Sequence, residues 1–179
     1  MPEPIAPRPE LKVIILAAGS GQRAGVDYPK VLQPLGDAKI IDYVVKSGLR
    51  FAAPGDIYIV IGRQGDQVQA HLGTAYNYVL QPAPRGTGDA VRCTAPFLRD
   101  FPGDRLILYG DTPLFRPSPL RGLVNRHYLK GATLTLFTAM AATSQPYGRI
   151  VRDEAGRIVD IIETAELAYY TKHGARIWA

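Results

Sequence analysis

The chain has 179 residues, of which 46% are hydrophobic and 21% charged, so we expect one globular domain with a substantial core. Its longest apolar runs are far shorter than the roughly 18 residues of a spanning helix, and residues 1–10 lack the pattern of a secretion signal, so a cytoplasmic location is expected. The formal net charge of +5 favours anionic partners, but the basic residues are scattered, which favours nucleotide phosphate over nucleic acid. Cys93 is the only cysteine, which excludes an internal disulfide and a multi-cysteine zinc site.

The first two-thirds of the chain alternates between two kinds of pattern. Residues 1–10 hold four prolines among polar residues and are expected to form a disordered or extended leader before the domain, residues 11–179. Strands are predicted over residues 13–17, 57–61, 76–80 and 106–109, and helices over 40–49, 66–72 and 89–98, the last ending near Pro96. This alternation predicts an α/β fold, a Rossmann-like and mostly parallel sheet with helices on both faces.

The later residues predict one long helix, one strand and a hairpin. Over residues 118–131, Ser118 suits the N-cap, Pro119 the first helical position and Gly131 the end of a helix. A strand is expected over residues 133–140. Two further strands, residues 149–152 and 157–162, flank a four-residue connection that ends in glycine, which is typical of a hairpin.

Four predicted loops follow strands of this sheet. In open parallel sheets ligands bind beyond the carboxyl ends of the strands. We therefore expect residues 19–30, 62–65, 81–87 and 110–114 to lie close together and to form a ligand site.

The first of these loops suits a polyphosphate. Gly19, Gly21 and Gly25 allow consecutive backbone N–H groups to approach phosphate oxygens, and Arg23 and Lys30 add positive charge. Residues 19–24 also match the dinucleotide fingerprint, but the following glycine and proline would interrupt the helix that this motif requires, and no acidic residue ends the second strand. A purely structural glycine turn remains as a second alternative.

Two other loops carry polar side chains of interest. Asp111 follows a strand directly and suits Mg²⁺, which is typically held by one or two carboxylates together with phosphate oxygens, although a turn aspartate before Thr112-Pro113 is the alternative. Gln81 can pair with a pyrimidine edge and Gly86-Thr87 can add backbone contacts, unless the segment is only a proline-rich connector. The three histidines lack metal-ligand spacing.

Together these motifs resemble the sugar-1-phosphate nucleotidyltransferases, most closely the uridyltransferase domain of bifunctional N-acetylglucosamine-1-phosphate uridyltransferases. The matching segments occur in order as Leu16 to Arg23, Pro29-Lys-Val-Leu32, Leu80-Gln81 with Gly86-Thr-Gly88, Leu108 to Leu114, and Tyr147-Gly-Arg-Ile150. The resemblance implies a nucleotide-diphospho-sugar transferase type of fold. It also implies Mg²⁺-dependent transfer of a uridylyl group from UTP to a sugar 1-phosphate with release of pyrophosphate, and it leaves homo-oligomerisation open.

The resemblance also implies roles for individual residues. Arg23 and Lys30 would be catalytic, Asp111 would bind the metal, and Gly148 and Glu163 would contact the sugar. The nucleotide would be bound by Leu16, Ala17, Ala18, Gly19, Gln81, Gly86, Thr87, Tyr109 and Gly110.

The chain departs from the family pattern at several positions. Gln22, Ala24 and Asp89 stand where the family usually has Thr, Met and His. After Glu163 the family continues to an Asn-Thr/Ser-Gly strand and to a second asparagine that shares the metal, whereas residues 164–179 contain no asparagine. We therefore expect a domain that is short at its C-terminus, and we retain two alternatives, a catalytically impaired nucleotide-binding or regulatory module and an inactive truncated fragment.

Overall fold

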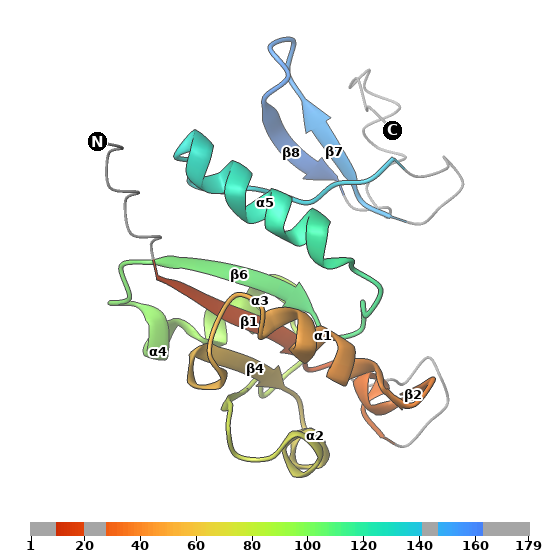
Figure 1. The fold of residues 1–179 in the computed structure, drawn as a ribbon. Helices are drawn as coiled ribbons and strands as arrows, with labels where there is room; N and C mark the ends of the chain where they lie inside the picture. The colour runs from red at the N-terminus through yellow and green to blue at the C-terminus, as the bar shows by residue number, and fades with distance from the viewer. Residues whose placement is uncertain (1–9, 20–27, 141–146, 163–179) are drawn as a thin grey trace. The chain divides into compact units, whose positions relative to one another are not determined.

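The computed structural model describes residues 10–19, 28–140 and 147–162 (Figure 1). The chain divides into two compact units, residues 1–132 and residues 133–179, which are described separately. In the described ranges no helix combines the length and the apolar character that crossing a membrane requires. Nearly all of the predicted leader lies outside these ranges.

The first unit is built on a four-stranded parallel sheet. Its strands are β1 (Leu11–Ala17), β4 (Ile57–Ile61), β5 (Asn77–Leu80) and β6 (Asp104–Tyr109), in the order β5-β4-β1-β6. Ile15 of β1 lies opposite Ile59 of β4 and Leu108 of β6. Every residue of β4 is buried, as a strand covered on both faces requires. The predicted α/β fold with a parallel sheet is confirmed.

Helices cover both faces of this sheet (Figure 1). Side chains of α1 (Ile40–Gly48), α2 (Gly65–Leu72) and α5 (Pro117–Lys130) share one hydrophobic core with Val13 and Ile15. Side chains of α3 (Thr87–Cys93) and α4 (Ala95–Leu98) pack with Ile14 on the opposite face. Because successive strand side chains point to opposite faces, β1 contributes to both cores.

Several predicted boundaries are wrong in detail. The helix predicted over residues 89–98 is two helices, and Pro96 lies in the first turn of α4, where its missing N–H costs no helical hydrogen bond. Helix α5 begins at Pro117 after Arg116, so Ser118 is not the N-cap. Strand β6 is buried on one face only, and Ile107 on its other face is 40% exposed. Among the described residues β6 pairs with β1 alone, so it lies at an edge of the sheet.

Short elements that the sequence did not predict connect β1 to α1. They are the 3-10 helix η2 (Lys30–Leu32) and the two-residue strands β2 (Pro34–Leu35) and β3 (Ala38–Lys39), which pair as a small hairpin. Another 3-10 helix, η3 (Pro54–Asp56), precedes β4. Elements of two or three residues are too short to show a hydrophobic period, so no sequence pattern indicates them.

The second unit contains the predicted hairpin. Strands β7 (Arg149–Arg152) and β8 (Ile158–Ile162) pair antiparallel, and Gly156 has a φ of +78° in the turn. Asp153 closes the turn by accepting hydrogen bonds from the backbone and side chain of Arg157. The strand predicted over residues 133–140 is wrong: these residues have no strand structure, and no described strand pairs with them.

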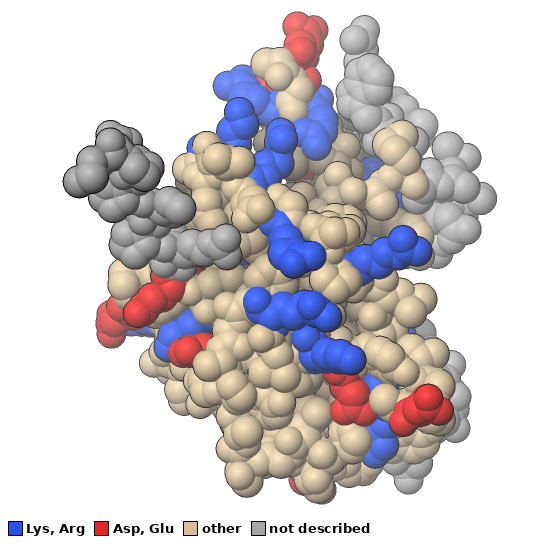
Figure 2. All heavy atoms as spheres, viewed as in Figure 1, with Lys and Arg blue, Asp and Glu red and all other residues tan. Residues whose placement is uncertain are grey.

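Basic side chains gather on one face of the first unit. Figure 2 shows Lys and Arg over α1 and α5 on the face that it views. Helix α5 contributes Arg121, Arg126 and Lys130 and contains no acidic residue. The positive net charge is therefore concentrated in part on this helix.

Candidate functional site

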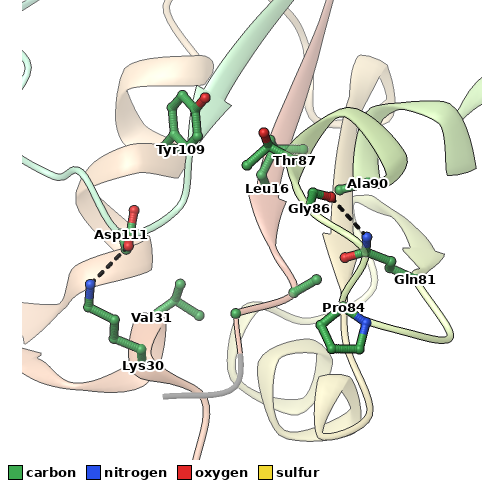
Figure 3. Close-up of a pocket in the computed structure, with 12 residues that line it drawn as sticks. Leu16, Lys30, Val31, Gln81, Pro84, Gly86, Thr87, Ala90, Tyr109 and Asp111 are labelled. Carbon is green, nitrogen blue, oxygen red and sulfur yellow. Dashed lines mark hydrogen bonds and ion pairs between the residues drawn. The ribbon is translucent and has the colours of Figure 1, made fainter. Parts of the chain in front are cut away.

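A cavity of about 270 Å³ lies at the carboxyl ends of β1, β5 and β6 (Figure 3). Three segments that are far apart in the sequence meet there, at the edge of the sheet where parallel strands present ligand sites. The lining residues are Leu16, Ala18, Gly19, Lys30, Val31, Gln81, Pro84, Gly86, Thr87, Ala90, Tyr109 and Asp111. As predicted, described residues of three loops line one cavity: Gly19 and Lys30 of the first, residues between 81 and 87 of the second, and Asp111 of the third. Residues 62–65 do not line it, and residues 20–27 lie outside the described part of the chain.

Two glycines set the path of the backbone at this site. The N–H of Gly110 donates to the carbonyl oxygen of Leu16 at 2.9 Å, and a Cβ at Gly110 would lie only 2.7 Å from that oxygen. Gly86 has a φ of +98°, a conformation that residues with a side chain rarely adopt. Gly110 thus holds the end of β6 against β1, and Gly86 turns the chain into α3.

Lys30 and Asp111 form an ion pair on the wall of the cavity (Figure 3). The Nζ of Lys30 donates to Oδ2 of Asp111 at 2.9 Å, and the two side chains are 47% and 42% exposed. Lys30 is placed by η2, in which Leu32 donates its N–H to the carbonyl of Pro29. The pair places a flexible ammonium group beside a carboxylate. A ligand phosphate can compete for Lys30, and a metal cation can compete for Asp111.

Gln81 enters the cavity from the end of β5 with its amide already hydrogen-bonded. The side chain is 5% exposed, and its Nε2 donates to the carbonyl of Gly86 at 3.1 Å and to Oδ2 of Asp89 at 3.0 Å. Arg92 donates to the other oxygen of Asp89 at 2.6 Å. The hydrogen bond from Gln81, followed by that from Arg92, holds the pKa of Asp89 below its ordinary value.

Asp89 is a site residue that the sequence reasoning missed. In the sequence, Asp89 stands at the start of a predicted helix and at a position where the family usually has His. Its position two residues after Thr87, at the start of a helix that follows the Gly86 turn, is the sequence signal that could have suggested a contact with Gln81.

The remaining residues predicted for the site either do not line the cavity or lie outside the described residues. Ala17 and Gly110 are buried next to lining residues but do not line the cavity. Gly148 is exposed in the second unit, and Arg23 and Glu163 lie outside the described residues. In the described part of the chain, no three or more His, Cys, Asp or Glu side chains are grouped in the arrangement of a metal site. The metal prediction therefore depends on the single carboxylate of Asp111.

Comparison with known proteins gives a consistent family match. A family model described as nucleotidyl transferase matches residues 12–178. Proteins called bifunctional protein GlmU are similar: that of Prochlorococcus marinus is 40% identical over 91% of this chain and 37% of its own length. That of Geobacter metallireducens is 39% identical over 86% of this chain and 33% of its own length. The chain therefore spans about a third of the length of these relatives.

Two solved structures share the fold at low sequence identity. A UDP-glucose pyrophosphorylase complexed with UDP-glucose has a TM-score of 0.69, at 20% identity, over 86% of this chain and 68% of the other. A structure from Bacillus anthracis, described as a glucose-1-phosphate thymidylyltransferase in complex with a sucrose, has a TM-score of 0.67, at 19% identity, over 93% of this chain and 76% of the other. These likenesses agree with the fold predicted for a nucleotide-diphospho-sugar transferase.

Proposed function

The chain belongs to the nucleotidyl transferase family, and we propose on that premise that it transfers a uridylyl group from UTP to a sugar 1-phosphate. The sugar substrate proposed is N-acetylglucosamine 1-phosphate, in line with the sequence resemblance and with the similarity to bifunctional GlmU proteins. In the reaction a phosphate oxygen of the sugar phosphate bonds to the α-phosphorus of UTP. The bond from that phosphorus to the bridging oxygen breaks, and pyrophosphate leaves with the bond's electron pair.

The observation that carries this proposal is the composition of the cavity. One part of its lining, Lys30 with Asp111, supplies charges suited to a triphosphate, and another, Gln81 with Gly86 and Thr87, supplies amide groups suited to a base edge. No protein nucleophile is required, because the attacking oxygen belongs to the substrate. The chain's contribution would be to orient the two substrates and to stabilise phosphate charge.

Several residues at the cavity then have a task in the proposed reaction. Lys30 would exchange its bond with Asp111 for a phosphate oxygen, a short movement for a half-exposed and flexible side chain. Tyr109, at the end of β6, would lie along the ribose, and Ala18 and Gly19 would present backbone groups to the phosphates. Arg23, in the same loop as Gly19, is proposed as a second phosphate-binding cation.

Magnesium is proposed as the metal. A single half-exposed carboxylate, that of Asp111, fits this ion, which prefers oxygen ligands and commonly takes the rest of its shell from water and substrate phosphates. When bound, it would neutralise charge on the phosphates of UTP. Asp111 would hold it, and the departure of Lys30 from that carboxylate would free an oxygen for the ion.

The test is pyrophosphate release from UTP and N-acetylglucosamine 1-phosphate with Mg²⁺, measured beside glucose 1-phosphate as an alternative acceptor. Faster turnover with the N-acetylated sugar supports the full proposal, and faster turnover with glucose 1-phosphate corrects the acceptor. UTP binding without turnover would instead favour a nucleotide-binding module. Absence of UTP binding would refute the proposal.

A further inference from the structure

We propose that Asp89 is a positioning residue, which fixes the orientation of the Gln81 amide and so decides which pyrimidine the cavity accepts. This inference rests on the proposed function, because it concerns the base of the bound nucleotide. Gln81 donates two hydrogen bonds within the protein, one to Gly86 and one to Asp89.

The two partners of the Gln81 amide determine which way round it lies. A backbone carbonyl and an ionised carboxylate only accept hydrogen bonds, so the group facing Gly86 and Asp89 has to be the NH₂ of the amide. Both of its hydrogens are then used. The carbonyl oxygen Oε1 is the atom of Gln81 left for a ligand, and Figure 3 shows it on the side of the amide away from the bond to Gly86.

Asp89 is itself held in place. Arg92, one turn further along α3, donates to Oδ1 of Asp89, which leaves Oδ2 directed to Gln81. The side chain of Asp89 is 14% exposed, whereas that of Arg92 is 73% exposed, so the arginine reaches inward from the surface to an aspartate that is mostly covered. On the other side, the positive φ of Gly86 sets the direction of the carbonyl that takes the second amide hydrogen. The orientation of Gln81 is therefore set by its protein neighbours.

This orientation distinguishes uracil from cytosine. A carbonyl oxygen accepts a hydrogen bond from the ring N3–H of uracil, whereas N3 of cytosine carries a lone pair that would face the oxygen with no hydrogen between them. Thymine presents the same N–H as uracil, so Asp89 selects a class of base rather than uracil alone. Without Asp89 only the carbonyl of Gly86 holds the amide, so the orientation that offers Oε1 to uracil is less strongly fixed.

The test compares the affinities of the whole chain for UTP and CTP, measured by calorimetry, in the unmodified protein and in variants. We expect UTP to be favoured by about tenfold or more, the effect of one hydrogen bond made or left unmade. In Asp89→Ala the ratio of UTP affinity to CTP affinity should fall, because one of the two acceptors that hold the Gln81 amide is lost. In Asp89→Asn the ratio should fall less than in Asp89→Ala, because the single asparagine oxygen accepts from either Gln81 or Arg92 but not from both in the present geometry. Asp100→Ala, which removes an exposed aspartate after α4, is the matched control and should leave the ratio unchanged.

The outcomes separate this inference from the proposed function. An unchanged ratio in Asp89→Ala would overturn the role of Asp89 while leaving UTP binding intact. If Asp89→Ala fails to fold, Asp89→Leu replaces it, because leucine has a similar shape and accepts no hydrogen bond, and an unchanged ratio there has the same meaning. If the unmodified chain binds neither nucleotide, the proposed function and the base preference both fail. In that case the side-chain amide NMR signals of Gln81 still report its orientation, and no change between the unmodified chain and Asp89→Ala would show that Asp89 does not position it.

Discussion

Replacing Lys30 by methionine should separate nucleotide binding from folding. The Lys30–Asp111 pair is 2.9 Å long, but its side chains are 47% and 42% exposed, so solvent screens it and it contributes about 0.2–1 kcal/mol to the free energy of unfolding. For a chain of this size that corresponds to a change in Tm of at most about 4 °C. Methionine keeps most of the apolar stem of the lysine, so little packing should be lost.

The effect of Lys30→Met on UTP should be larger. A hydrogen bond between an ammonium and a phosphate is worth about 1.5–3 kcal/mol, and the exposure of Lys30 favours the lower end, so the Kd for UTP should rise about tenfold. Calorimetric titration with UTP and thermal unfolding of the same samples give both quantities. Lys46→Met, which removes an exposed lysine of α1 outside the cavity, is the matched control. A Kd for UTP that does not change, or a fall in Tm of 10 °C or more, would refute this account of Lys30.

Three further predictions concern the same region. Asp111→Asn should remove the dependence of UTP affinity on Mg²⁺ while leaving the fold intact, and titrations with and without the ion would show a retained dependence if another residue held it. Gly110→Ala should lower the free energy of unfolding by about 1–3 kcal/mol, because the new Cβ would meet the carbonyl of Leu16; denaturant unfolding measures this, and a neutral result would contradict the tight contact. Because the pKa of Asp89 is lowered from 3.8, its ionised form stabilises the fold above that pH, and this contribution is lost as the pH falls through the lower folded value. An NMR titration should place the midpoint of Asp89 below 3.8 and closer to 3.8 in Arg92→Ala, and an unshifted midpoint would contradict the hydrogen bonds to Asp89.

The sequence predicted the parts of the fold that depend on hydrophobic patterning. The strand over Ile57–Ile61 has the predicted bounds, because an unbroken apolar run of that length suits a strand buried on both faces. The strand predicted over residues 133–140, where threonines are interspersed with apolar residues, does not form. Strand formation depends on a neighbouring strand as well as on composition, and in the described residues nothing pairs with this segment. A local pattern contains no information about whether the neighbour exists.

For the candidate site, the sequence predicted which residues lie together but not how their side chains pair. Topology alone placed Gly19, Gln81 and Asp111 at one edge of the sheet, since parallel strands bring their carboxyl ends together, and these residues do line one cavity. The sequence did not indicate how the polar side chains pair within the site.

The side-chain pairing depends on residues that are distant in the sequence or on the shape of a turn. Lys30 donates a hydrogen bond to a residue 81 positions away, and Gln81 donates to Asp89 across a turn whose shape depends on the positive φ of Gly86. Motif matching assigns a residue type to a position, whereas the orientation of the Gln81 amide follows only from which of its neighbours accept hydrogen bonds. For that reason Asp89, which belongs to none of the predicted binding motifs, carries the most specific hypothesis about this site.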